Sequence, residues 1–370
     1  MISTLVTWKM CVGLYNNNMK GAKKFTRKFG VFVMLNVFCC ILVYSNLPDK
    51  TVRKIPPGFK NVYARYDLSK KNECDYNCQT QVQQYRKDTL TEVCAEMGRH
   101  SPYGEKQLHA YDVMRLHLDH IYVIDSMQLM FCAIPKAGSS NWKRVILALT
   151  GAIDDVKSIH QYNIHNTIAA KGTLLSDYSF RDVLHRVRNY KKFVFVRDPF
   201  VRLLSAYRNK LERAASPFRR KFGPRIKKTW LAKLRGISRF NVSFTEFADY
   251  LRNQRNTLMT GPEEHWREMY RLCEPCSIGY DFIGKMESID RDAQYVFDNV
   301  INVTENSKIY FMNSSANIHV TGSSDETIFD KYYHSLPDAT IQGLLQRYKP
   351  DFRLFGYDVP VVSKPNYTKR

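Results

Sequence analysis

Acidic residues are scarce in this sequence relative to basic ones. Its 370 residues include 35 Asp and Glu against 56 Lys and Arg, which leaves a formal net charge of +21. Such an excess carries little information about fold, but it indicates an anionic partner such as nucleic acid, an anionic membrane or an acidic glycan. Internal repeats and low-complexity blocks are also absent, which argues against a solenoid or another repeat architecture.

Two common site patterns are missing as well. The nucleotide-binding pattern G-x-x-x-x-G-K-[ST], in which the lysine follows the loop glycines, does not occur in its expected setting, and neither does a magnesium-binding acid. Both absences argue against a kinase. The pair Cys273-x-x-Cys276 lacks a second CxxC or a suitably spaced histidine pair. A disulfide role is therefore favoured over a zinc half-site or a redox pair.

The sequence has only one long apolar run, from Phe29 to Tyr44, and a cluster of five Lys and Arg residues precedes it. No small-x-small cleavage site comes after it. A type II signal anchor is therefore favoured over a cleaved signal peptide or a buried segment. We expect a cytoplasmic tail (1–28), a transmembrane anchor (29–45), a luminal stem (46–115), one luminal α/β domain (116–360) and a C-terminal tail (361–370).

Glycosylation acceptors and cysteines agree with this orientation. Four N-x-[ST] triplets follow the apolar run and none precedes it. Six cysteines after the run form an even set, as expected for disulfides in an oxidising compartment, although their pairing is open. Nucleic acid is then not an expected partner. The triplets begin at Asn241, Asn302, Asn313 and Asn366, and the cysteines are Cys74, Cys78, Cys94, Cys132, Cys273 and Cys276.

The stretch FCAIPKAGSSNWK, residues 131–143, predicts an anion site. The apolar run 127–134 indicates a buried parallel strand, and the apolar spacing of residues 142–149 indicates a helix that Ser139 or Ser140 can cap. A strand, a tight turn and a helix aim free backbone N–H groups at an anion. Ala137 and Gly138 keep the turn open, and Lys136 stands at the end of the strand.

A second segment, KKFVFVRDPFVRLLSAYRNKL, residues 191–211, repeats this order. Phe193 to Val196 reads as a short buried strand, with Asp198 as a helix cap and Pro199 at the first helical position. Arg197 and Ser205 are then suited to hold a second phosphate by a guanidinium fork and a hydroxyl. Two anion sites at one edge of an α/β sheet predict a nucleotide that is phosphorylated at two places.

These residues resemble the Golgi carbohydrate sulfotransferases of the chondroitin, dermatan and HNK-1 type. The 5′-phosphosulfate loop of that family is similar to the segment from Pro135-Lys136 through Asn141 to Arg144, and its 3′-phosphate motif is similar to the segment from Phe195 to Lys210. The blocks HWREMYRLCEPCSIGYDFIGKMESIDRDA (265–293) and YKPDFRLFGY (348–357) also match, so the resemblance covers most of residues 116–357. Ser139 stands where members often have cysteine, which leaves the partner of Cys132 open.

The resemblance implies a P-loop-like parallel sheet flanked by helices, the fold of sulfotransferases that use 3′-phosphoadenosine 5′-phosphosulfate, and no metal. It assigns Lys136 to the leaving group and the sulfonate, and the turn from Ala137 and Gly138 through Ser139, Ser140 and Asn141 to the 5′-phosphate. Arg197 and Ser205 are assigned to the 3′-phosphate, and Asp198, Pro199 and Arg202 complete that motif.

The attacking sugar hydroxyl needs a base, because it must lose its proton as it reacts. His165, which lies between the two phosphate motifs, is our candidate for this catalytic role. His160 and His185 are nearby alternatives, and Glu287 and His265 are more distant ones.

The acceptor is predicted from charge. Residues 208–235 hold eleven Lys or Arg and one acid, Glu212, with aromatic residues between them. A solvated helix face is the plain reading, but this density favours a surface for an anionic chain or for the Golgi membrane. The resemblance favours 4-O-sulfation of N-acetylgalactosamine in chondroitin by a type II protein of the Golgi membrane, and it also admits a homodimer. The alternatives are another glycan acceptor or a glycan-binding protein without transferase activity.

Overall fold

The computed structural model describes residues 76–99, 113–160, 163–213, 216–227, 241–253, 263–302, 309–312 and 321–358. The chain divides into two units, Met1–Lys71 and Asn72–Arg370, and all of the described residues belong to the second. The predicted tails and anchor, and the acceptors Asn313 and Asn366, lie outside these residues. Within them, no helix is both long enough and apolar enough to span a membrane.

A five-stranded sheet forms the centre of the domain, in the order β3-β1-β2-β4-β5. The parallel sheet that we predicted is present only in part, because β2, β4 and β5 are parallel while β1 pairs antiparallel with both β2 and β3. The link between β1 and β2 is only the short 3₁₀ turn η1 (Asp125–Met127) and Gln128, which is too short for a parallel crossover. The strands are β1 (Ile121–Ile124), β2 (Leu129–Cys132), β3 (Thr173–Leu174), β4 (Lys191–Val196) and β5 (Phe282–Lys285).

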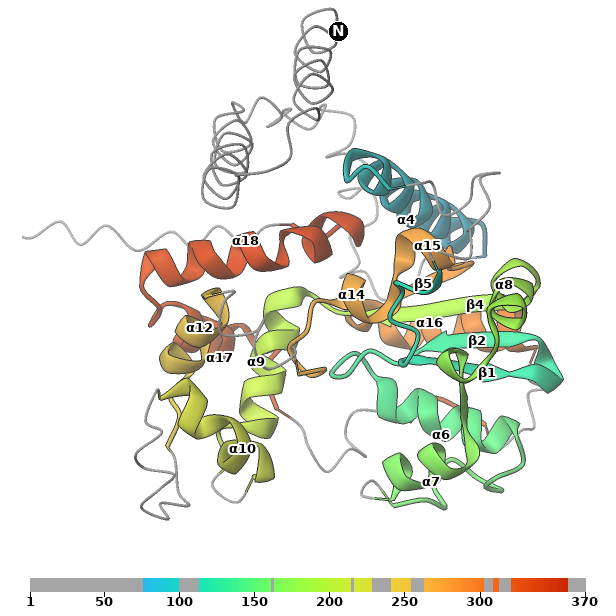
Figure 1. Cartoon of the computed structure of the whole chain (residues 1–370), viewed down its shortest axis with the longest axis horizontal. Coiled ribbons are helices and arrows are strands. Elements are labelled where there is room, and N and C mark those ends of the chain that lie inside the picture. The colour runs from blue at the N-terminus through green and yellow to red at the C-terminus, as the bar shows by residue number, and fades with distance from the viewer. Residues whose placement is uncertain are drawn as a thin grey trace, which may run out of the picture. The chain divides into compact units, whose positions relative to one another are not determined.

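Helices cover both faces of the sheet and form a second group beside it (Figure 1). Those near the sheet are α4 (Tyr76–Glu96), α6 (Ser139–Leu149), α7 (Ile164–Lys171), α8 (Phe180–Asn189), α14 (Met269–Cys273), α15 (Pro275–Ile278) and α16 (Ile289–Tyr295), which continues into the π-helical turn η4 (Val296–Ile301). The second group is α9 (Pro199–Lys210), α10 (Pro217–Ile226), α12 (Phe244–Arg252), α17 (Glu326–Tyr333) and α18 (Asp338–Leu354). The remaining 3₁₀ turns are η2 (Leu175–Asp177) and η3 (Met286–Ser288).

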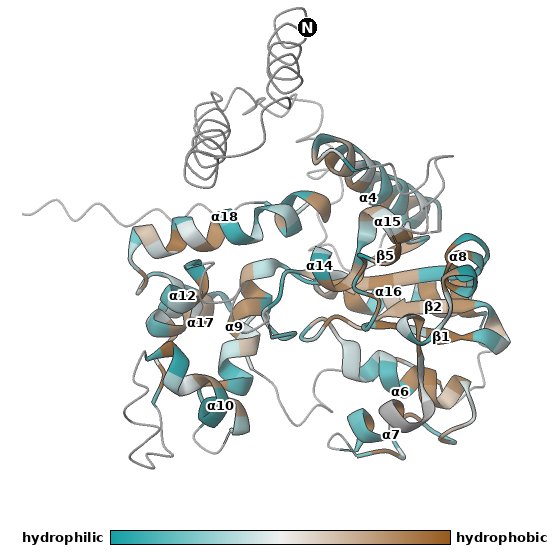
Figure 2. Ribbon diagram, viewed as in Figure 1, coloured by the Kyte–Doolittle hydropathy of each residue, from teal (hydrophilic) through white to brown (hydrophobic). Residues whose placement is uncertain are grey.

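The strands are apolar on both faces because helices bury both (Figure 2). Alternate residues therefore enter different cores. Met130 and Val194 pack with α4 and α8 on one face, whereas Phe131 and Phe193 pack with Trp142 of α6 and with α7 on the other. A third core joins the helices of the second group around Trp266, which is 1% exposed.

Helix α4 belongs to the folded domain, although we placed residues 46–115 in a stem. Leu90 and Cys94 are fully buried, and Arg86 forms a buried ion pair with Asp292 at 2.7 Å. The same guanidinium donates to the carbonyl of Ile283 in β5 at 2.6 Å. The described domain therefore begins by Tyr76, about forty residues before the predicted boundary.

Two disulfides confirm the predicted role of the CxxC pair. Cys273 is bonded to Cys132 at the end of β2, and Cys276 is bonded to Cys94 in α4. Each cysteine of the pair thus fastens a different element to the corner between α14 and α15. This arrangement uses both thiols, and so it leaves no dithiol for a zinc half-site or a redox pair.

Candidate functional site

The two predicted anion loops lie side by side at one edge of the sheet. Strands β2 and β4 are parallel neighbours, with Cys132 opposite Val194, so the loops that follow them leave the sheet together. A direct contact joins the loops, because Arg197 Nη1 donates to the carbonyl of Lys136 at 3.2 Å. The sequence-predicted residues 136–141 and 197–205 are thus brought into one site.

The first loop offers backbone donors. Helix α6 begins at Ser139, but its cap is Gly138, whose φ of 75° is left-handed and whose place we had predicted for Ser139 or Ser140. A side chain at Gly138 would meet Met286 Sδ at 3.0 Å. The amides of Gly138, Ser139 and Ser140 donate to no other residue that the structure describes. Three free N–H groups at a helix start favour a bound anion.

Lys136 is held in an unusual position at the front of this loop. Its φ of 70° lies in the left-handed region, where residues with a side chain are uncommon. Burial, first, and the positive charges of Arg197 and Lys210 together lower the pKa of its ammonium group to about 7. A cation under this repulsion gains from an anionic ligand.

Two other residues of the loop brace it from inside. The amide of Ala137, which is 1% exposed, donates to the carbonyl of Ile134 at 3.2 Å. Asn141 Nδ2 donates to the carbonyl of Met312 at 2.8 Å, and its Oδ1 accepts from Arg144 at 2.8 Å. The side chain of Asn141 is therefore engaged within the protein, and Asn141 serves to hold the loop.

Asp198 and Pro199 start helix α9 as predicted. Asp198 Oδ1 accepts from the amides of Phe200 and Val201 at 2.9 Å, while Pro199 occupies the first turn. Burial, with the nearby charge of Glu287, raises the pKa of Asp198 to about 6, although the hydrogen bonds from Val201 and Phe200 act against this rise. The amide of Asp198 itself donates to Glu287 Oε1 at 2.8 Å. Glu287 thus fastens the second loop to η3.

Arg197 and Ser205 meet a row of hydroxyls that sequence reasoning missed. Arg197 Nη2 lies 3.1 Å from Ser323 Oγ and 2.7 Å from Ser324 Oγ. Ser205 Oγ lies 3.0 Å from Thr321 Oγ1, which in turn lies 3.1 Å from Ser323 Oγ. One guanidinium and four hydroxyls therefore converge, a donor set that suits a phosphate monoester.

Arg202 has a different place from the one that its motif suggested. It is 1% exposed, and it donates to the carbonyls of Pro135 at 2.9 Å, Arg267 at 2.7 Å and Glu264 at 3.0 Å. A guanidinium occupied in this way ties three backbone segments together. We therefore describe Arg202 as a positioning residue of the loop before Lys136.

His165 lies on the exposed side of α7. Partial desolvation, and then the charges of Lys143 and Lys210, together lower the pKa of its imidazole to about 4, while Glu264 acts against this shift. A neutral imidazole can accept a proton. His185, in contrast, is on α8, which packs against the other face of the sheet, and its ring lies 3.2 Å from Asn189 Nδ2. His160 is exposed in the segment before α7.

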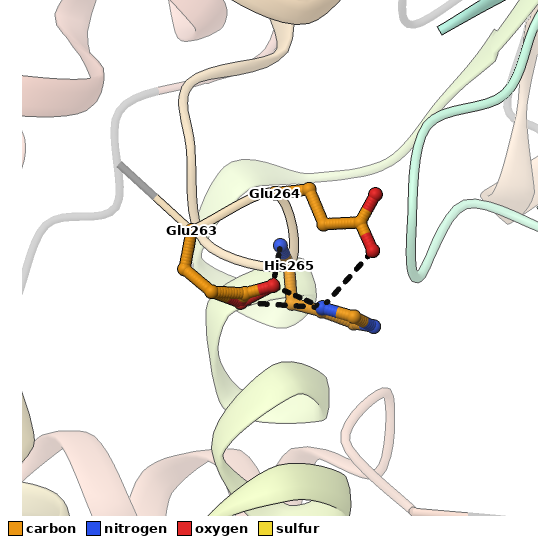
Figure 3. Close-up of side chains that lie close together, drawn as sticks. All are labelled: Glu263, Glu264 and His265. Carbon is orange, nitrogen blue, oxygen red and sulfur yellow. Dashed lines mark hydrogen bonds and ion pairs between the residues drawn. The ribbon is translucent and has the colours of Figure 1, made fainter. Parts of the chain in front are cut away.

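A cluster of two carboxylates and one imidazole lies beside α9. Figure 3 shows Glu263 and Glu264 converging on His265, where Glu263 Oε1 lies 2.7 Å and Glu264 Oε1 lies 3.7 Å from the same Nδ1. Glu264 Oε2 also lies 3.4 Å from His120 Nε2. These ligand atoms are close enough together to hold a cation, although a hydrogen bond from the imidazole Nδ1–H alone accounts for the contact of Glu263. Sequence reasoning considered His265 only as a distant alternative base.

Comparison with known proteins agrees with the geometry. The model of the sulfotransferase family matches residues 119–358. The chain belongs to the sulfotransferase family. It is 34% identical to carbohydrate sulfotransferase 14 of Danio rerio over 319 residues, covering 84% of this chain and 81% of that protein. It is also 32% identical to carbohydrate sulfotransferase 12 of Mus musculus, covering 74% and 68%, and 33% identical to carbohydrate sulfotransferase 8 of Mus musculus, covering 76% and 64%. No solved structure matches.

The family confirms the enzyme class that the sequence predicted and implies 3′-phosphoadenosine 5′-phosphosulfate as the sulfonate donor. The residues of this sulfotransferase fit such a donor. The free amides at the start of α6 suit a 5′-phosphosulfate, and the group of Arg197 with four hydroxyls suits a 3′-phosphate. The positive charges of Arg197 and Lys210, which act after burial to lower the pKa of Lys136, would be offset by an anionic ligand.

Proposed function

We propose that this sulfotransferase transfers a sulfonate group from 3′-phosphoadenosine 5′-phosphosulfate to a hydroxyl of an anionic glycan, and that the acceptor is chondroitin, at the 4-position of N-acetylgalactosamine. The observation that carries the proposal is the pair of anion loops after β2 and β4, joined by the contact between Arg197 and Lys136. Loops that bind two separate phosphate groups fit a nucleotide that carries both.

The donor lies across both loops in this proposal. The amides of Gly138, Ser139 and Ser140 hold the 5′ end, and Arg197 with Ser205 holds the 3′-phosphate. The bound donor supplies a sulfonyl group that is joined to its 5′-phosphate through an anhydride oxygen. Lys136 stabilises the negative charge that develops on that oxygen, as preorganised cations do in related phosphoryl transfers.

His165 acts on the acceptor side. Its imidazole, kept neutral by desolvation and by the nearby lysines, accepts the proton of the attacking hydroxyl. The same lysines, Lys143 and Lys210, disfavour the resulting imidazolium, whereas Glu264 favours it. Because its pKa is about 4, His165 remains in the proton-accepting form at every pH above 5.

Helix α10 supports an anionic acceptor. Arg220, Lys221 and Arg225 are exposed on it, while Phe222 packs against Trp266 with ring centroids 5.0 Å apart. The aromatic residue is thus an anchor for the helix, and the cations face outward. Trp230 and the rest of the basic segment, residues 228–235, lie outside the described residues. The cations that are described favour an acidic polysaccharide chain.

Membrane attachment and orientation complete the proposal. We infer that the predicted anchor, residues 29–45, holds the protein in the Golgi membrane with the sulfotransferase domain in the lumen. Protease added to sealed microsomes should then spare everything after about residue 46. Digestion of the domain under these conditions would contradict a type II orientation.

The test of the activity uses residues 46–370, incubated with sulfur-labelled donor and a panel of desulfated glycosaminoglycans. We expect labelling of desulfated chondroitin, and disaccharide analysis should place the label at the 4-position of N-acetylgalactosamine. Labelling of a different glycan would retain the enzyme class and change the acceptor. A protein that binds glycan and donor product but labels no chain would support the glycan-binding alternative.

A further inference from the structure

Glu264 is an acid in a site that is otherwise cationic. Its charge interacts with Lys143, Lys210 and His165, the residues that surround the proposed acceptor side. Its side chain is 48% exposed. An exposed carboxylate among cations that attract an anionic chain reduces that attraction locally, so it requires an explanation.

The position of Glu264 is fixed relative to Lys136. One buried guanidinium, that of Arg202, donates to the carbonyl of Glu264 at 3.0 Å and to the carbonyl of Pro135, the residue before Lys136, at 2.9 Å. Two carbonyl groups bound to the same planar fork lie within a few ångströms of each other. Glu264 therefore stands beside the loop end where sulfonate transfer is proposed.

The carboxylate of Glu264 keeps hydrogen-bonding capacity. Its contacts to His120 Nε2 and His265 Nδ1 measure 3.4 and 3.7 Å, whereas a charge-assisted hydrogen bond is about 2.7–2.9 Å long. The neighbouring Glu263 differs, because it is 10% exposed and lies 2.7 Å from the same Nδ1 (Figure 3). The side-chain contact with His120, and after it the charges of His265 and Lys143, lower the pKa of Glu264 to about 2, so it is an anion at neutral pH.

We propose that Glu264 determines acceptor specificity, accepting a hydrogen bond from a free hydroxyl next to the attacking one on the same sugar unit and repelling a unit whose attacking hydroxyl already carries a sulfate ester. The proposal rests on the sulfotransferase function proposed above. A free hydroxyl can donate to a carboxylate, whereas a sulfate ester has only acceptor oxygens and adds a like charge. The cations bind the chain, and Glu264 distinguishes the acceptor unit from the product unit.

The experiment compares Glu264→Gln with the matched variant Glu263→Gln in the full-length protein. Transfer to desulfated chondroitin gives KM for the acceptor, and competition by 4-sulfated chondroitin gives Ki for the product chain. In the wild type we expect product to bind more weakly than acceptor. In Glu264→Gln the ratio of Ki to KM should fall about tenfold or more, since a hydrogen bond to a charged group is lost and a repulsion is removed.

Three controls separate this role from a structural one. Glu263→Gln should keep the wild-type ratio, and Glu264→Asp, which retains the charge, should keep most of it even if Glu264→Gln fails to fold. Affinity for 3′-phosphoadenosine 5′-phosphate should be unchanged in Glu264→Gln. A general loss of folding would instead lower both affinities together.

Several results would overturn the inference. If the wild type transfers sulfonate and Glu264→Gln leaves the ratio unchanged, the inference alone is wrong. If the wild type labels no glycan, the proposed function fails and the inference fails with it. If chelation abolishes transfer and added Zn²⁺ or Mn²⁺ restores it, Glu263, Glu264 and His265 hold a metal ion, and Glu264 has no role in specificity.

Discussion

The two loops at the edge of the sheet offer different donors to an anion. The loop after β2 offers mainly backbone amides and one strained lysine, whereas the loop after β4 offers a guanidinium and a hydroxyl that already contact partners in residues 321–324. Lys136 in the first loop is buried beside other cations, and burial and these charges both lower its pKa. We therefore expect charge stabilisation during the reaction from the first loop and nucleotide recognition from the second.

Replacements of Lys136 and His165 should produce the two largest effects. If its charge acts mainly on the leaving oxygen, Lys136→Ala should reduce single-turnover sulfonate transfer by about 10²–10³-fold. Donor affinity should change much less, because the backbone amides remain. The matched control is Lys191→Ala, at the far end of β4. Normal turnover in Lys136→Ala would remove the proposed difference between the loops.

Replacement of His165 should also act on turnover. The loss of a general base lowers the rate by about 10²–10⁴-fold, and acceptor affinity should be nearly retained in His165→Ala. His185→Ala is the control, since α8 packs on the opposite face. If His160→Ala reduces the rate while His165→Ala does not, the base is His160.

Donor binding should depend on pH through the first loop. An anionic ligand raises the pKa of Lys136 from about 7, so binding takes up a proton above that pH. Affinity for 3′-phosphoadenosine 5′-phosphate should therefore fall above pH 7, by about tenfold in total for a pKa that binding raises by one unit. Titration calorimetry between pH 6.5 and 9 measures this fall. Lys136→Met should show a flat profile, and a wild-type profile equally flat would contradict the lowered pKa.

Removal of one hydroxyl in the second loop should have the smallest effect. Thr321→Val removes the contacts to Ser205 and Ser323. A neutral hydrogen bond contributes about 0.5–1.5 kcal/mol, which corresponds to a loss of about 2–13-fold in affinity for the bisphosphate. Ser335→Ala, at the corner between α17 and α18, is the control. Unchanged affinity in Thr321→Val would show that the hydroxyl row does not support the phosphate site.

Local sequence patterns predicted those parts of the site that depend on neighbouring residues. The two strand-turn-helix segments, the cap by Asp198 and the placement of Lys136 near Arg197 follow from spacing and from the rule that parallel strands end at one edge. The cap of α6 was assigned to a serine because serine is a common cap, and the left-handed conformation of Gly138 could not be read from its neighbours.

The rest depends on partners that are distant in sequence. Arg202 bonds to carbonyls 62 and 67 residues away, and Ser205 bonds to Thr321, 116 residues away. Arg86 of α4 pairs with Asp292, 206 residues away, which is why that helix was taken for part of a stem. Such contacts arise from the packing of the whole domain, so they cannot be predicted from local periodicity in the sequence.

The most direct test of the two-loop account is a calorimetric comparison of two nucleotides on two proteins. Adenosine 5′-phosphate lacks the 3′-phosphate. Because Arg197 also contacts Lys136, its replacement can disturb the first loop, and such a disturbance affects the binding of both nucleotides. The ratio of the two affinities therefore reports on the 3′-phosphate. We predict that the wild type prefers 3′-phosphoadenosine 5′-phosphate, and that Arg197→Ala loses about 10–150-fold of that preference while its affinity for adenosine 5′-phosphate is retained. Equal affinity of the wild type for both nucleotides, or a full preference in Arg197→Ala, would contradict the account.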